Sequence, residues 1–153
     1  MPKKITVDTE KMINIMSRLD FFENFSKLDL RRMLIRETDV FLFDKAELIL
    51  RKGKSDYDFY ILLSGSVSIV TDNNIVNRIN AGSFFGEMSF LTHEPRSANV
   101  IANEDALVMK IDNAVMERLH LSVKNKIKDK IIHRLIDNIK KMNILLDDKS
   151  GRK

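Results

Sequence analysis

The residues best suited to bind a small molecule lie close together, within residues 84–98. Gly86 allows a sharp backbone turn and the close approach of a ligand to the amides that follow it. A helical turn beginning at Met88 would point free N–H groups outward, which favours an anion. Arg96 offers a planar guanidinium that pairs bidentately with phosphate, and Glu87 offers acceptors for a sugar hydroxyl. Together these residue types predict a pocket for a ligand with one phosphate and one ribose.

The same residues follow a known family pattern. Phe85-Gly86-Glu87 is followed by Ser89 and an apolar residue, and after a short loop by Arg96-Ser97-Ala98 and alternating apolar positions. This run resembles the phosphate-binding cassette of the cyclic nucleotide-binding domain family, found in catabolite activator proteins and protein kinase A regulatory subunits. The one departure is Phe90, where an aliphatic residue is usual.

The resemblance implies a role for each of these residues. Arg96 would neutralise a cyclic phosphate, and Glu87 would accept the ribose 2′-hydroxyl. Further donors would come from Gly86 and from the backbone around four more residues, Met88, Ser89, Ser97 and Ala98. Considered singly, Glu87 could instead cap a helical turn, and Arg96 could pair with Glu94 or Glu104. Their joint spacing favours the ligand site.

A second signature of this family lies upstream, in residues 49–53 and 59–65. Its glycines and its apolar block match in spacing. Lys54 and Asp56 depart from the usual residues, and we expect both in a turn where the departure changes only detail. Two signatures in the expected order are more specific than either signature alone.

The length and composition of the chain are those of a globular domain that could position this site. The chain has 153 residues, of which 44% are hydrophobic and 31% charged, enough for one domain with a core. The absence of cysteine excludes disulfides and thiolate metal sites. No apolar run approaches membrane-spanning length, so we expect a cytoplasmic protein with no membrane span. The net charge of +4 is too mild to mark a nucleic-acid groove.

We interpret residues 1–153 as a single domain. Within it, the spacing of the apolar residues changes twice, from helical to strand-like and back to helical. Residues 8–36 show helical spacing, with a capping-box pattern at Ser26 and Asp29. Residues 40–112 contain short, partly alternating apolar runs separated by turns such as Asp72-Asn73-Asn74, which predicts a jelly roll. The expected fold class is mainly β with flanking helices: a double-stranded β-helix or β-roll, an N-terminal helical bundle and C-terminal helices.

The C-terminal helices are expected over residues 113–146, with Asp112 or Asn113 as a cap, and residues 147–153 as a solvated tail. From residue 127 to residue 146 the apolar positions form a stripe too wide for one partner. One edge contains Ile132, Ile136, Ile139 and Leu146; the other contains Ile127, Ile131, Leu135, Met142 and Leu145. The roll can bury only one edge, so the other predicts a homodimer through this helix. A helix folded as a lid over the ligand is the alternative.

Two other functions are weighed against the family. A jelly-roll metal enzyme needs clustered His and Glu ligands on facing strands. His93 falls in a loop, and His120 and His133 fall in predicted helices, so we predict no metal and no enzyme. A DNA-binding module would need far more chain after Leu146 than the tail provides.

The sequence therefore predicts a stand-alone cyclic nucleotide sensor that signals to an unknown protein effector by movement of its C-terminal helices. Ser97 discriminates poorly between the bases, because its hydroxyl could reach a phosphate oxygen or a guanine amino group. The Arg96-Ser97 pair resembles bacterial activators that bind cyclic AMP (cAMP), so cAMP is favoured over cyclic GMP (cGMP). The alternative is an interaction scaffold of the same fold that dimerises without ligand.

Overall fold

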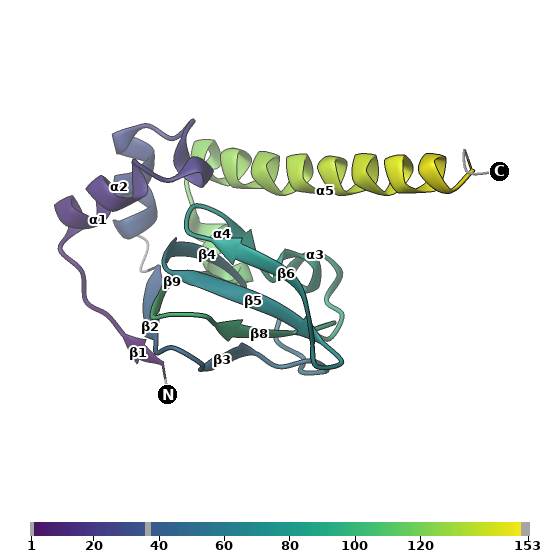
Figure 1. The fold of residues 1–153 in the computed structure, drawn as a ribbon. Helices are drawn as coiled ribbons and strands as arrows, with labels where there is room; N and C mark the ends of the chain where they lie inside the picture. The colour runs from purple at the N-terminus through teal and green to yellow at the C-terminus, as the bar shows by residue number, and fades with distance from the viewer. Residues whose placement is uncertain (1, 36–37, 151–153) are drawn as a thin grey trace.

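The computed structural model describes residues 2–35 and 38–150, and within them two antiparallel sheets lie face to face (Figure 1). The five-stranded sheet has the order β1 (Lys3–Lys4), β2 (Asp39–Phe43), β9 (Ala106–Ile111), β4 (Phe59–Ser64) and β7 (Phe84–Phe85). The four-stranded sheet has the order β3 (Leu48–Leu50), β8 (Asn99–Ala102), β5 (Ser66–Thr71) and β6 (Asn74–Asn80). The expected β-roll with flanking helices is confirmed.

Strand β4 lies at the centre of the molecule, and its first five residues are all buried. Because successive side chains point to opposite faces of a sheet, this strand contributes to two cores. Phe59, Ile61 and Leu63 join the core shared with the helices. Tyr60 and Leu62 join the core between the two sheets. A strand that is buried on both faces reads as a continuous apolar run, as this one does.

The hairpin between β5 and β6 forms at the predicted turn. Asp72 and Asn73 both have positive φ, 51° and 64°, which matches the two-residue turn that suits the twist of a hairpin. A hairpin at this turn requires a strand after it, and that strand is β6. It is a sheet edge on which only Ile79 is buried, so its residues carry little hydrophobic pattern.

The N-terminal helices fall within the predicted range: α1 (Thr9–Met16), the short 3-10 turn η1 (Asp20–Phe22) and α2 (Lys27–Ile35); residue 36 lies outside the described residues. The capping box is confirmed. The Ser26 N–H donates to Asp29 Oδ2 at 3.0 Å, and the Asp29 N–H donates to Ser26 Oγ at 3.1 Å. The helices cover the five-stranded sheet with a common apolar core.

The C-terminal helices are α4 (Asn113–Arg118) and α5 (Leu121–Ser150). The carboxylate of Asp112 caps α4 by accepting the Val115 N–H at 2.7 Å. His120 precedes α5 instead of lying within a helix, and its ring nitrogen lies 3.2 Å from the Ser122 N–H. Helix α5 continues to Ser150, so the prediction of a tail from residue 147 is wrong for residues 147–150; residues 151–153 lie outside the described part. Residues 121–150 contain no proline or glycine that would stop the helix.

Helix α5 buries only the N-terminal part of one of its two apolar edges. Val123, Ile127 and Ile131 are at most 2% exposed against the rest of the domain, whereas Ile136 and Ile139 are 43% and 58% exposed. The C-terminal half of α5 runs past the sheets (Figure 1), and there Met142, Leu145 and Leu146 are also exposed. Among the described helices, none has the length and apolar character needed to cross a membrane.

Candidate functional site

The site is built around a short helix that interrupts the roll between β7 and β8. Helix α3 (Glu87–Thr92) starts one residue earlier than the sequence predicted. Its N-cap is Gly86, with φ of +83°, a left-handed conformation that side chains with a Cβ rarely adopt. His93 ends the helix with φ of +58° and is exposed, as expected for a surface histidine. The sharp turn at Gly86 brings the start of α3 beside Arg96.

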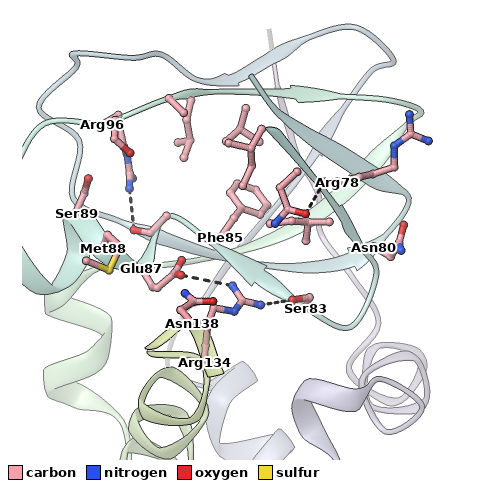
Figure 2. A pocket seen from close by; sticks show the side chains of 18 of the residues that line it. Arg78, Asn80, Ser83, Phe85, Glu87, Met88, Ser89, Arg96, Arg134 and Asn138 are labelled. Carbon is pink, nitrogen blue, oxygen red and sulfur yellow. Dashed lines mark hydrogen bonds and ion pairs between the residues drawn. The ribbon is translucent and has the colours of Figure 1, made fainter. Parts of the chain in front are cut away.

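A cavity of about 640 Å³ opens between α3, strands β5 and β6, and helix α5. The seven residues predicted as ligand-binding all line it: Gly86, Glu87, Met88, Ser89, Arg96, Ser97 and Ala98. The structure therefore brings together every candidate from the sequence. Figure 2 shows Arg96 on one wall, with Glu87 on the wall below it beside α5.

Arg96 is almost completely buried, with 3% of its side chain exposed. Its Nη1 donates to the Gly86 carbonyl at 2.8 Å, and its Nη2 donates to the Asp58 carbonyl. Nη2 also lies 3.2 Å from Asp56 Oδ1, so an ion pair compensates the charge. The alternative, in which Arg96 pairs with a carboxylate of the chain, therefore holds in this structure, with Asp56 as the partner and not Glu94 or Glu104. Within the described residues, Arg96 Nε is buried without a hydrogen-bond partner.

Glu87 is 9% exposed at the opposite end of the cassette from Arg96. Its Oε1 lies 3.5 Å from Nη1 of Arg134, a residue of α5. Arg134 also donates to the Phe84 carbonyl and to Ser83 Oγ. Burial lowers the pKa of Arg134 below its ordinary value, and the neighbouring Glu87 carboxylate opposes this change. The guanidinium stays charged at neutral pH.

Sequence reasoning missed two charged residues of the site. Asp56 appeared only as a departure from a family signature. Its loop is tied to Arg96 by the backbone, because the Gly53 N–H donates to the Arg96 carbonyl at 2.8 Å. Arg134 was not named at all in the analysis of the sequence. Lys126, Lys130 and Arg134 follow one another at intervals of four residues, and this spacing was the available signal that they share one face of the helix.

Other ionisable groups near the cavity serve the fold. Burial raises the pKa of the Asp58 carboxyl, although Lys110 at 3.2 Å opposes the change. Burial also raises the pKa of the Tyr60 phenol, whose ring stacks on Phe85 at 5.4 Å between centroids. Within residues 2–35 and 38–150, no group of three or more His, Asp or Glu side chains is placed to hold a metal ion.

Comparison with known proteins agrees with this geometry. The family model of the cyclic nucleotide-binding domain matches residues 40–122. The chain is 26% identical over 115 residues to a cAMP-dependent protein kinase type II regulatory subunit of Drosophila melanogaster, covering 72% of this chain and 29% of that protein. It is 26% identical over 117 residues to the cGMP-dependent protein kinase egl-4 of Caenorhabditis elegans, covering 71% of this chain and 15% of that protein.

The chain thus spans less than a third of these relatives. Its fold is similar to the crystal structure of a cyclic nucleotide-binding domain from Methylobacillus flagellatus, with a TM-score of 0.78 and 18% identity, covering 97% of this chain and 89% of that one. The match to the family model, over residues 40–122, covers more than half of the chain and includes both β4 and the α3 turn. The chain belongs to the cyclic nucleotide-binding domain family.

Proposed function

We propose that this protein is a sensor that binds a 3′,5′-cyclic nucleotide, with cAMP favoured over cGMP, in the cavity beside α3. One observation carries the proposal: Glu87 and Arg96, two buried groups of opposite charge, line a single cavity of about 640 Å³. Arg96 would pair with the cyclic phosphate, and Glu87 would accept the ribose 2′-hydroxyl. Gly86, Met88, Ser89, Ser97 and Ala98 would surround the phosphate and sugar.

The surroundings of Arg96 support the phosphate assignment. Two backbone carbonyls, of Gly86 and Asp58, hold the guanidinium in one orientation. A fixed guanidinium loses little conformational entropy when an anion arrives. Its buried Nε has no partner among the described residues, and a phosphate oxygen would satisfy that donor.

The proposal also concerns which base, adenine or guanine, the cavity accepts. Ile69 and Ile79 line the cavity from strands β5 and β6 and offer an apolar surface for a purine ring. Ser97 is exposed at the cavity, and its hydroxyl suits a phosphate oxygen or a guanine amino group. The resemblance of Arg96-Ser97 to cAMP-binding activators favours cAMP.

The output of the sensor would pass through α5. Arg134, Asn138 and Lys141 line the same cavity, so a bound nucleotide can contact this helix directly. A ligand shifts a conformational equilibrium only by its differential affinity for the two states, and such contacts provide one. The proposal includes a stand-alone cytoplasmic sensor, an unknown protein effector, and a homodimer that buries the exposed edge of α5.

The exposed edge also favours a second candidate, a scaffold that dimerises without ligand. Calorimetric titration with cAMP and with cGMP separates the two. We expect saturable binding, tighter for cAMP, and a loss of about 2–5 kcal/mol of binding free energy in Arg96→Ala, as for truncation of one member of a buried charge pair. Absence of binding by the folded wild-type protein would favour the scaffold, and unchanged binding by Arg96→Ala would refute the phosphate assignment.

A further inference from the structure

Helix α5 and the body of the domain leave two apolar surfaces uncovered, and the two surfaces complement one another. We infer that the C-terminal half of α5 from a second copy of this chain lies antiparallel in a groove beside α3, so that a two-fold dimer fills both grooves. The inference rests on the homodimer of the proposed function and specifies its direction and its contact surface. It does not depend on nucleotide binding.

The first surface is a groove of about 400 Å³ between α3, α4 and the first half of α5. It shares no lining residue with the cavity proposed for the nucleotide. Leu91 and Ile132 are 46% and 51% exposed. Exposed apolar side chains around a groove are typical of a surface that binds an amphipathic helix. The apolar lining comes from all three helices: Phe90, Leu91, Met116, Ile131, Ile132 and Leu135.

The second surface is a heptad seam on α5 itself, which consists of Ile132, Leu135, Ile139, Met142 and Leu146. These residues follow one another at intervals of three, four, three and four, the spacing of side chains that pack between two coiled helices. Met142 and Leu146 are 64% and 61% exposed, in the part of α5 that runs past the sheets (Figure 1). A helix with a bare apolar seam is stabilised by a second helix that covers it.

The seam begins inside the groove. Ile132 and Leu135 belong to both surfaces, so a helix that covers the seam along its length also enters the groove. Residues 136–147 are all exposed in the structure. The C-terminal half of a second α5 can therefore enter the groove without uncovering any core of its own domain.

The distribution of charge along α5 favours the antiparallel direction. Residues 121–135 contain five Lys or Arg residues and one Asp, whereas residues 136–150 contain three cations and three carboxylates. In a parallel dimer the two cationic halves would face one another. In an antiparallel dimer each cationic half faces a half without net charge, so the repulsion is smaller.

Two lysines of the groove carry most of this repulsion. Lys124 and Lys128 line the groove together with Glu117, and within the described residues neither lysine forms an ion pair. In a parallel two-fold dimer each lysine would lie near its own copy, and opposed like charges are destabilising. The other three cations of this half of α5 already pair with carboxylates of the domain body: Lys126, Lys130 and Arg134.

One antiparallel register covers the whole seam. In it, Ile132 of one copy lies against Met142 of the second copy, and Leu135 lies against Ile139. The same contacts repeat on the other side of the axis, because a two-fold interface is isologous. Leu146 extends beyond them into the groove. Identical residues at position 132, or at position 142, are then ten residues apart along the helix pair, about 15 Å.

Cysteine cross-linking tests the direction, since the chain contains no cysteine. Ile132→Cys and Met142→Cys, each with a different affinity tag, are mixed, left to exchange subunits and oxidised mildly. We expect a disulfide between the two variants, and at most about a tenth as much within either variant alone, because about 15 Å is beyond the reach of a disulfide. Ile144→Cys, which is off the seam and 60% exposed, controls for random collision.

Disulfides within each single variant, with none between the two, would mean a parallel dimer. That result would overturn the inference and leave the proposed homodimer intact. Absence of a disulfide in every sample would overturn the inference as well, and sedimentation of wild type would then show whether the homodimer fails with it. Calorimetry with cAMP tests nucleotide binding independently of both results.

Leu91→Asp tests the groove separately, because Leu91 lines the groove and not the proposed nucleotide cavity. Dimerisation should weaken at least about tenfold, since the second helix would bury a charge. Leu28→Asp is the matched control on α2, where Leu28 is 55% exposed, and it should leave dimerisation unchanged. Sedimentation measures both variants, and thermal unfolding verifies their folding. Unchanged dimerisation in folded Leu91→Asp would mean that no helix enters the groove, which contradicts the inference.

Discussion

Asp56 and Arg96 form an ion pair of 3.2 Å at the edge of the cavity, between a partly exposed carboxylate and a guanidinium that is almost fully buried. The pair compensates the Arg96 charge before any ligand binds. The orientation of Arg96 also depends on the Gly86 and Asp58 carbonyls. Asp56 is therefore a source of negative charge near the site proposed for phosphate, and its removal leaves the guanidinium in place.

We predict that Asp56→Asn tightens cAMP binding. The repulsion between a phosphate and a partly exposed carboxylate is worth on the order of 1 kcal/mol, or about fivefold in affinity, after solvent screening. Calorimetry at low and high salt measures the gain, which should shrink at high salt. The gain should persist in an Arg96→Ala background, because the repulsion between Asp56 and the phosphate does not act through Arg96. Weaker binding by Asp56→Asn would mean that Asp56 orients Arg96.

Gly86 is required for two separable reasons, and a second glycine offers the control. A Cβ at residue 86 would lie 2.9 Å from Arg96 Nη1, at a φ of +83°. Gly53 has a similar φ of +86° with nothing within 4 Å. Both alanine variants should lose about 1–2 kcal/mol of stability through the left-handed backbone.

Only Gly86→Ala should also displace Arg96, and we expect its cAMP affinity to fall at least about tenfold, as a misplaced charge contact implies. Denaturant unfolding and calorimetry on the two variants make the comparison. Equal losses of cAMP affinity in both variants would mean that backbone strain causes the loss. The close contact between a Cβ at residue 86 and Arg96 would then not be the cause.

Asp29 should make stability depend on acidic pH. Burial alone would raise its pKa, but donors from Lys126 and Ser26 outweigh burial and lower it below its ordinary value of 3.8. A group whose pKa is lower in the folded state stabilises it above the unfolded pKa. That stabilisation is lost as pH falls through the folded pKa. Wild type should therefore lose stability below about pH 4, as Asp29 takes up a proton.

Thermal unfolding of Asp29→Asn from pH 7 to pH 3 tests this expectation. The variant should be about 1–3 kcal/mol less stable at pH 7, through loss of a cap and a buried charge contact, and its pH profile should be flatter. Glu10→Gln, which removes the exposed pair with Arg31, should change stability by less than about 1 kcal/mol. Parallel profiles for wild type and Asp29→Asn would contradict the assignment.

The exposed edge of α5 should carry the proposed homodimer. Ile136→Asp places a charge in the middle of this edge and should weaken dimerisation at least about tenfold, since a buried isoleucine contributes about 1.5–3 kcal/mol. Ile144→Asp is the control: Ile144 is 60% exposed but lies about 80° around the helix from Ile136. Sedimentation with and without cAMP measures both, and a wild-type monomer in both conditions would refute the dimer.

Local sequence patterns predicted several structural features of this protein. The capping box at Ser26 and Asp29, the hairpin at Asp72 and Asn73, and the left-handed turn at Gly86 follow from interactions within a few residues. Such interactions are encoded by residue type and spacing. The two apolar edges of α5 were likewise evident from helical periodicity, but periodicity did not show that only the first part of one edge, at Ile127 and Ile131, would be buried.

Tertiary structure alone decided the charged partners of the site. Asp56 meets Arg96 only because the loop before β4 pairs with the backbone around residue 96, and Arg134 meets Glu87 only because α5 docks in one register. These partners are separated by 40 and 47 residues. Many cations and carboxylates along the chain could pair equally well by type, so packing of distant elements selects among them. Sequence pattern identified the groups proposed to bind the ligand, and the fold determined which charges lie against them.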